Sequence, residues 1–164
     1  MKIREIKISF DEYDHLSECN PEDRQLIERA KEAIENSYAP YSLYQVGAAI
    51  ELSNGEILTA ANQENVAYPS GICAERAVLF YAQSKFPHAS VKAIAITAVF
   101  NGSSLSEPVT PCGACRQVMA EYEARHSSRM KIIMASDSGK VYITNGIDSL
   151  MPLLFKADNL KKRK

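Results

Sequence analysis

The run VKAIAITAVF occupies residues 91–100 and is apolar at nearly every position. A strand with one solvent face alternates apolar and polar residues, whereas a strand covered on both faces is apolar throughout. The run therefore predicts a central strand with helices packed over both faces of its sheet.

The segments around this run carry further strand signals. Before it, QVGAAIEL and EILTAAN flank Asn54-Gly55, and two β-prone runs around Asn-Gly predict a hairpin. After it, MKIIMAS and a short run at 141–144 flank the turn Asp137-Ser138-Gly139. Residues 2–10 (KIREIKISF) alternate imperfectly and predict an edge strand.

Helices are predicted between these strands. Asn20-Pro21 is an N-cap followed by proline at the first helical position, and the segment up to residue 37 has one apolar face. Further helices are predicted over 73–85, with Phe80 among its buried residues, over about 112–124, and over 147–154. This order predicts an α/β fold: a three-layer α/β/α sandwich with a mixed sheet of about five strands and a parallel crossover.

Length and charge restrict the function classes. A chain of 164 residues has the size of one domain, so residues 1–164 are expected to form one catalytic unit with an N-terminal extension at about 1–20. The net charge of −1 and a single basic run, KKRK at 161–164, give no sign of nucleic-acid binding. No signal peptide or membrane span is apparent, so a cytoplasmic protein is expected.

Three of the four cysteines lie where helices are predicted to begin. Cys73 precedes one helix, and Cys112 and Cys115 stand one turn apart at the start of another. A helix N-terminus stabilises a thiolate through its free N–H groups and its dipole. Three thiolates on Zn²⁺ leave the fourth position open for water, as in catalytic sites. We expect one zinc ion per chain.

Two residues after Cys73 complete the predicted chemistry. Glu75 lies beside the metal ligands, where a carboxylate can transfer protons. Three thiolates and Zn²⁺ leave one net negative charge, which opposes ionisation of water. We therefore expect Arg76 to hydrogen-bond a ligand sulfur and to offset that charge.

Each element of the site has a simpler interpretation. A C-x-x-C pair alone is compatible with a redox dithiol or with half of a structural zinc site, for which Cys19 could supply a fourth ligand. The combination C-A-E … P-C-x-x-C, however, matches the pattern of zinc-dependent nucleobase deaminases, with Cys in place of His. The pattern therefore favours a catalytic zinc site.

Beyond the zinc motif, the chain resembles the small, homotetrameric cytidine deaminases. The resemblance runs through YAPYSLYQVGAAI (38–50), NQENVAYPSGICAER (62–76), PCGACRQVM (111–119) and LMPLLFKADNL (150–160). These segments follow in the family's order over about three quarters of the chain. The resemblance implies zinc-dependent hydrolysis of cytidine and deoxycytidine to uridine and deoxyuridine plus ammonia.

The resemblance also implies substrate contacts. Asn62 and Glu64 would bind the ribose 3′-hydroxyl, which both nucleosides carry, and the Ala74 N–H would receive the pyrimidine O2. The Thr110 carbonyl would lie near the leaving ammonia. Phe155 of a neighbouring subunit would pack over the pyrimidine, and Tyr68 of a neighbour would approach the sugar.

Several positions depart from the family's pattern. Tyr44 in the pocket wall stands where the family usually has Phe. Leu153, Leu154 and Lys156 replace smaller residues around Phe155. The nearest alternative is a deaminase of another aminopyrimidine, such as a blasticidin-type antibiotic, and the N-x-E-N element argues against it. A nucleic-acid editor would need a basic or aromatic surface, and a structural-zinc interaction module would need Cys19 on the metal.

Overall fold

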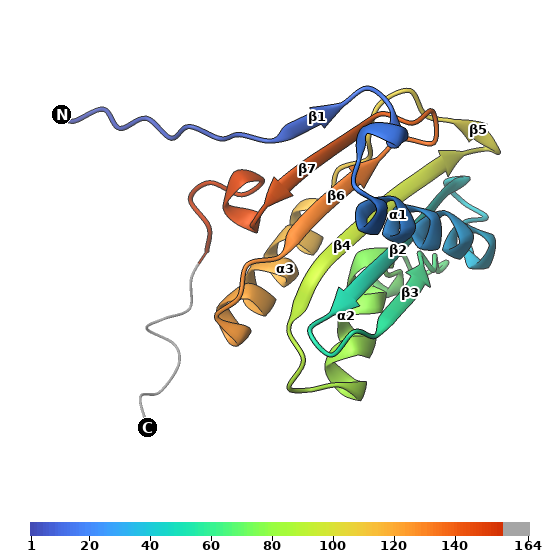
Figure 1. Cartoon of the computed structure of the whole chain (residues 1–164). Helices are drawn as coiled ribbons and strands as arrows, with labels where there is room; N and C mark the ends of the chain where they lie inside the picture. Colours follow the sequence, from blue (N-terminus) through green and yellow to red (C-terminus); the bar gives the residue numbers. More distant parts are fainter. Residues whose placement is uncertain (156–164) are drawn as a thin grey trace.

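The computed structural model of the protein describes residues 1–155, and Figure 1 shows their elements in chain order. The strands are β1 (Asp11–Tyr13), β2 (Tyr44–Leu52), β3 (Ile57–Ala61), β4 (Val91–Phe100), β5 (Ser103–Ser104), β6 (Lys131–Ala135) and β7 (Val141–Asn145). The α-helices are α1 (Pro21–Ala33), α2 (Ala74–Lys85) and α3 (Gly113–His126). Short 3-10 turns lie at η1 (Leu16–Glu18), η2 (Ile34–Asn36), η3 (Tyr68–Ser70) and η4 (Ile147–Ser149).

All strands join one mixed sheet in the order β1-β7-β6-β4-β2-β3, with β5 paired to the end of β4. Strands β4 and β6 are parallel, with Ile94 opposite Ile132, and α3 lies in the connection between them. The other pairings are antiparallel. The mixed sheet and its parallel crossover confirm the predicted topology.

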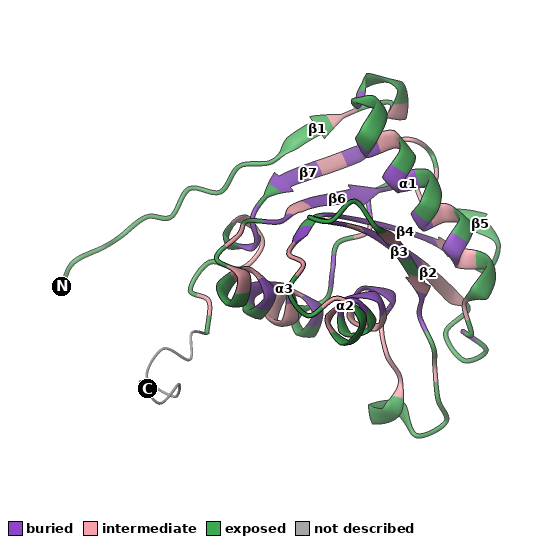
Figure 2. Ribbon diagram, turned by 60° about the horizontal axis from the view of Figure 1, so that its bottom comes forward, coloured by how far each residue is buried: buried purple, intermediate pink, exposed green. Residues whose placement is uncertain are grey.

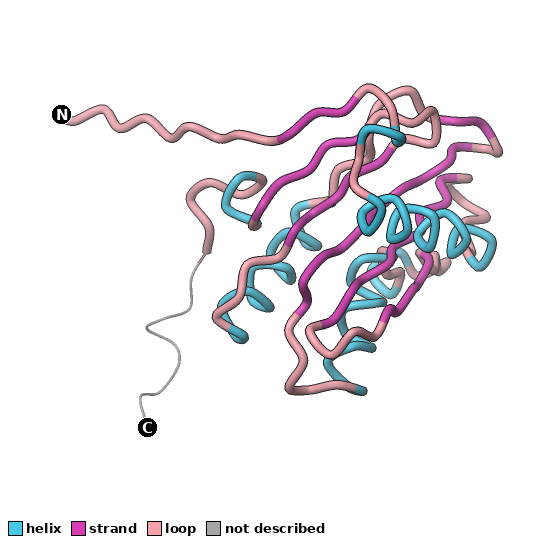
Figure 3. Tube along the Cα trace, in the orientation of Figure 1, coloured by secondary structure: helices cyan, strands magenta, loops and turns pink. Residues whose placement is uncertain are grey.

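Helices cover both faces of the sheet: α1 lies on one face and α2 and α3 lie on the other, as Figures 2 and 3 show. Successive residues of β4 enter the two cores in turn. Ile94 and Ile96 pack with α2 and α3, while Ala93 and Ala95 pack with α1. The three-layer α/β/α prediction is confirmed, because the apolar run of β4 is buried on both sides.

Helix α1 approaches the sheet very closely at Gly47 in β2. A Cβ atom there would lie 2.0 Å from the carbonyl oxygen of Ala30 and 2.9 Å from Cγ1 of Ile34. Only glycine allows the helix backbone to come this near to the strand. Asn20 fixes the start of the same helix, because its Oδ1 accepts a hydrogen bond from the N–H of Asp23 at 2.8 Å.

The sheet has seven strands and not about five, because the short strands β1 and β5 add to five longer ones. Asn101 and Gly102 have φ of 49° and 70°, a tight turn that folds the two-residue strand β5 back onto β4. At the N-terminus, the expected edge strand over 2–10 is wrong in position: pairing with β7 is confined to Asp11–Tyr13.

Two helix predictions also need correction. The helix expected over 147–154 is only the 3-10 turn Ile147–Ser149, because Pro152 disfavours helical backbone just before it. In α2, Phe80 is 48% exposed and lies outside the core. Lys156 and the basic run at 161–164 lie outside the described residues. No helix among residues 1–155 is long and apolar enough to cross a bilayer.

Candidate active site

The N-termini of α2 and α3 bring three cysteines together on one face of the sheet. Cys73 and Cys112 occupy the N-cap positions of the two helices, and Cys115 lies in the first turn of α3. The Sγ atoms of Cys73 and Cys112 are 3.9 Å apart, and those of Cys112 and Cys115 are 3.4 Å apart. All three sulfurs lie within 4.8 Å of one another.

This sulfur triangle fits a tetrahedral zinc ion. Zinc–sulfur bonds of about 2.3 Å place neighbouring sulfurs about 3.8 Å apart in a tetrahedron. Cys19 does not complete the set, because it packs with α1 on the opposite face of the sheet. Among the described residues, the group therefore offers three ligands and leaves the fourth direction to water or substrate.

The three thiols do not ionise equally. The pKa of Cys73 lies well below its ordinary value, chiefly because Cys115 donates a hydrogen bond to its sulfur, with Arg76 as a further donor. The pKa of Cys115 is raised in turn by the same hydrogen bond, then by burial. One negative charge in this cluster therefore resides first on Cys73, at the start of α2.

Arg76 takes the position predicted for it. Its Nη2 donates to the Sγ of Cys73 at 3.8 Å. Its Nε is buried and, within the described part of the chain, has no hydrogen-bond partner. The guanidinium thus places a permanent positive charge against the thiolate cluster.

Glu75 lies in the first turn of α2, 4% exposed, beside the sulfurs. Burial is the largest influence on its carboxyl and raises the pKa, and the negative charge of Cys73 acts in the same direction. A carboxyl group with a raised pKa can both accept and return a proton near neutral pH. Its carboxyl can therefore exchange protons beside the sulfurs.

A cleft of about 500 Å³ opens over these residues. Its walls come from β2, from the loop before α2 and from the loop before α3, and both apolar and polar groups line it. The lining residues are Ser42, Tyr44, Val46, Asn62, Glu64, Tyr68, Gly71, Ile72, Cys73, Glu75, Arg76, Val109, Thr110 and Cys112.

Comparison with known proteins assigns the family. The protein-family model of the cytidine and deoxycytidylate deaminase zinc-binding region matches residues 20–131, which include the three cysteines and Glu75. The chain belongs to the cytidine and deoxycytidylate deaminase family. A cytidine deaminase of Halalkalibacterium halodurans is 40% identical over 139 residues, 84% of this chain and 98% of that one.

Further relatives of this deaminase family agree. A cytidine deaminase of Sporosarcina psychrophila is 38% identical over 136 residues, 83% of this chain and 93% of that one. A crystal structure of cytidine deaminase from Burkholderia pseudomallei superposes with a TM-score of 0.69 at 37% identity, covering 80% of this chain and 97% of that chain.

Asn62, a ribose-binding residue by family resemblance, is held by its own chain. Its Oδ1 accepts from the N–H of Val46 at 2.8 Å and from Oγ of Ser37 at 2.6 Å. Its Nδ2 donates to the carbonyl of Tyr44 at 2.9 Å. Both lone pairs of the amide oxygen are therefore occupied, and only the second Nδ2 hydrogen is left for a ligand.

Glu64 is half-buried and lines the same cleft. Its Oε2 accepts from the N–H groups of Tyr41 at 2.9 Å and of Ser42 at 3.2 Å. The pKa of this carboxyl is lowered, first by the Ser42 side chain and also by these N–H groups. Glu64 is therefore an ionised acceptor, suited to a sugar hydroxyl.

Aromatic residues line the same cleft. Tyr68 lines the cleft of its own chain and packs against Tyr41 with ring centroids 6.0 Å apart. The family resemblance implies that Tyr68 of a neighbouring subunit approaches the sugar. In this chain, Tyr68 is the first residue of the turn η3, which leads to Cys73 at the start of α2. Tyr44 contacts Phe100, and burial, then the charge on Glu75, raises the pKa of its hydroxyl.

Arg116, in the PCGACR segment, makes contacts beside the site that the sequence pattern did not reveal. Its Nε donates to the carbonyl of Pro111 at 2.7 Å, and its Nη2 donates to Oγ1 of Thr110 at 3.3 Å. It thereby holds the loop that carries Thr110 and leads into Cys112. The acceptors are chiefly backbone carbonyls, which leave no trace in a residue pattern.

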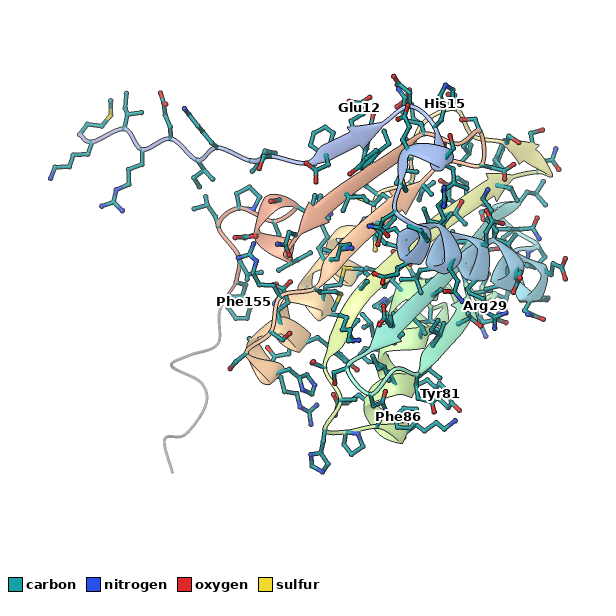
Figure 4. All side chains as sticks on the ribbon, in the orientation of Figure 1. Glu12, His15, Arg29, Tyr81, Phe86 and Phe155 are labelled. Carbon is teal, nitrogen blue, oxygen red and sulfur yellow. The ribbon has the colours of Figure 1, made fainter. Side chains whose placement is uncertain are left out.

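Phe155 lies apart from the cleft of its own chain. Its ring is 67% exposed, and its carbonyl accepts from Nε2 of Gln117 at 3.3 Å (Figure 4). The residue is therefore free to contact a neighbouring molecule.

Proposed function

We propose that the protein is a zinc-dependent hydrolase that converts cytidine and deoxycytidine to uridine and deoxyuridine with release of ammonia. One observation carries this proposal: the buried carboxyl of Glu75 lies beside a three-cysteine group, and the same cleft is lined by Glu64, a carboxylate that can accept a hydrogen bond from a sugar hydroxyl. The named relatives, 37–40% identical, are cytidine deaminases.

Cys73, Cys112 and Cys115 would hold the ion. When bound, zinc supplies a water activated for attack near neutral pH and a positive charge near the oxygen that develops negative charge. The N–H groups at the starts of α2 and α3 and the guanidinium of Arg76 offset the charge of the thiolates.

The protein residues move the protons and orient the base. One Oε atom of Glu75 accepts a proton from the attacking water and delivers it to N3 of the pyrimidine, which makes C4 more electrophilic. Glu75 then takes the second proton and returns it to the exocyclic amine, so that ammonia leaves. The Ala74 N–H holds O2, and the Thr110 carbonyl accepts from the departing amine.

We propose that Glu64 and Asn62 recognise the sugar. We assign an accepted hydrogen bond from the 3′-hydroxyl to Glu64 and a donated one from Nδ2 of Asn62. Both groups read a hydroxyl that ribose and deoxyribose share. The proposal thus includes both nucleosides and no polymer.

We further propose that the chain acts as a single catalytic domain, with residues 1–20 as an extension, in a cytoplasmic homotetramer with shared active sites that serves pyrimidine salvage. The exposed ring of Phe155 supports the sharing, because a neighbour's cleft would cover it. Thiolate ligands persist in a reducing compartment, which supports the location.

The substrate class is tested by a panel on zinc-loaded protein: cytidine, deoxycytidine, cytosine and a blasticidin-type antibiotic. We expect turnover of both nucleosides, with kcat/KM for cytosine lower by about 100-fold because binding energy from the sugar is lost. Glu64→Gln should reduce turnover of the nucleosides and spare that of cytosine. Turnover of the antibiotic without turnover of either nucleoside would refute the assignment.

Sharing of sites is tested by mixing two impaired variants. Glu75→Gln subunits keep Phe155, and Phe155→Ala subunits keep Glu75. Tetramers reassembled from both should regain part of the wild-type activity, since some sites receive both residues. If the activity of the mixture equals the mean of the separate variants, the sites are not shared.

A further inference from the structure

Residues 1–10 form an extended arm that leaves the body of the protein at β1 (Figures 1 and 4). The family match begins at residue 20 and leaves this arm unexplained. The arm exposes a row of large apolar side chains: Ile6 is 57%, Ile8 56% and Phe10 50% exposed. Exposed apolar side chains in a row on an extended segment favour pairing with another strand.

The arm continues an open sheet edge. Within the described residues, β1 pairs with β7 along one side only. Glu12 stands opposite Tyr142, and the ring of Phe10 packs on Tyr142 with centroids 4.9 Å apart. Phe10 and Glu12 therefore share the face of the sheet that carries Tyr142. The even-numbered residues before them would continue this face if the arm extended the strand, because side chains alternate along a strand.

We propose that two copies of the chain pair antiparallel through this segment, with a two-fold axis at Ile8. Each arm then lies along β1 of the other copy. Ile8 faces Ile8, and Ile6 faces Phe10 of the second copy. On the same face, Arg4 faces Glu12 and Lys2 faces Asp14 of the second copy.

Charge complementarity selects this register. An axis at Lys7 would set Lys7 against Lys7, and an axis at Ser9 would set Ile6 against Glu12. With the axis at Ile8, the apolar residues meet in the middle and the ion pairs flank them on both sides. Directly opposite pairs of these kinds stabilise a sheet.

The odd-numbered face is compatible with this pairing. Ile3 faces Tyr13 of the second copy, and the one unfavourable pair is Glu5 opposite Asp11. Lys7 lies diagonal to that Asp11 and reduces the repulsion. Glu12 already has Lys140 at 3.5 Å within its own chain, and Arg4 would add a second cation to the same carboxylate.

The register is tested by single cysteines and mild oxidation of the zinc-loaded full chain. Ile8→Cys places two thiols directly opposite each other, about 5 Å apart between Cα atoms, within reach of a disulfide. Ile3→Cys is the matched control, because ten residues of offset separate the two copies of position 3 by more than about 30 Å. Wild-type protein gives the background from native cysteines.

We expect Ile8→Cys to give covalent dimers whose disulfide-linked peptide joins position 8 of both copies, and Ile3→Cys to give background levels. Arg4→Glu should slow Ile8→Cys cross-linking about fivefold or more, since two opposite pairs become like-charged, while Arg4→Lys should not. Equal cross-linking of both cysteine variants, or none of either, overturns the proposal. Cytidine turnover should persist in every variant, because the arm contributes nothing to the cleft, so this outcome is separable from the proposed activity.

Discussion

Nη1 of Arg116 donates a hydrogen bond to the carbonyl of Leu150 at 2.6 Å, across 34 positions of the chain. The same guanidinium binds the carbonyl of Pro111. One side chain of α3 thus ties the loop before Cys112 to the segment that leads to Phe155.

We predict that Arg116→Lys lowers kcat/KM for cytidine about 10- to 100-fold and speeds zinc loss to a chelator, as is usual when a group that orients metal ligands is removed. A lysine ammonium cannot span three acceptors with a planar fork. Arg125→Lys, an exposed position on the same helix, is the control. Wild-type kinetics and zinc retention in Arg116→Lys would show that the clamp is dispensable.

Lys131→Met should destabilise the fold by about 2 kcal/mol, measured by denaturant unfolding. Nζ of Lys131 lies 2.8 Å from Oδ1 of Asp23, whose side chain is only 6% exposed, and the substitution leaves a buried carboxylate without its cation. This loss of unfolding free energy is smaller than for a fully buried ion pair, because Lys131 itself is 37% exposed and solvent screens its charge.

The matched control for that substitution is Lys92→Met. Its ion pair with Glu51 has the same 2.8 Å length, but the carboxylate side chain of Glu51 is 33% exposed, against 6% for Asp23. We expect a loss below about 0.5 kcal/mol. Similar losses in the two variants would mean that burial of Asp23 does not set the energetics.

Gly47→Ala should destabilise the protein by about 3 kcal/mol, because the new methyl group would overlap the Ala30 carbonyl and force α1 away from β2. Gly113→Ala is the comparison: no heavy atom lies within 4 Å of its Cβ position, and alanine favours a helix. Melting temperatures should therefore fall for Gly47→Ala and stay level or rise for Gly113→Ala. The reverse order would contradict the close approach.

Glu123 gives a prediction about pH. Its Oε1 accepts from the N–H groups of Met130 at 2.8 Å and of Ile147 at 3.2 Å, yet burial dominates and raises the pKa of the carboxyl in the folded state. The folded protein then holds this proton more tightly than the unfolded chain. Glu123 therefore contributes stability at acid pH that is lost as pH rises from the unfolded pKa through the folded one.

Glu123→Gln keeps an oxygen for both N–H groups and removes the titration. Its stability relative to wild type should increase as pH rises from about 4 to 7, the range just above an ordinary glutamate pKa. Thermal unfolding of both proteins across this range measures the difference. Parallel profiles would show that burial of Glu123 does not perturb its ionisation.

Most of the framework was predictable because its signals are local. The continuous apolar run at 91–100 predicted β4 over its full length, and Asn20-Pro21 predicted the start of α1. The same Asn-Gly signal that predicted the β2–β3 hairpin recurs at Asn101-Gly102, where a two-residue strand is too short to show periodicity. The helix expected over 147–154 is wrong because Pro152 disfavours helical backbone at the residue before it.

The candidate site also has features that were predictable from the sequence and features that were not. The combination C-A-E … P-C-x-x-C predicted that Cys73, Cys112 and Cys115 would meet, because it matches the ligand pattern of zinc-dependent nucleobase deaminases. The hydrogen bonds that hold the Asn62 side chain could not be predicted, since they depend on the N–H of Val46 and the carbonyl of Tyr44 across the β2–β3 pair. Side-chain hydrogen bonds to backbone groups that are distant in the sequence can be predicted only when the fold is known.

We propose that Glu75 transfers the protons of cytidine hydrolysis at a three-cysteine zinc site. The most direct test of this proposal is the single-turnover rate of cytidine loss by Glu75→Gln protein, with zinc content measured on the same sample. We expect one zinc ion per chain and a rate reduced by more than about 10⁴-fold, since one carboxyl serves several proton transfers. A zinc-loaded Glu75→Gln protein that deaminates cytidine within about tenfold of the wild-type rate would contradict the proposal.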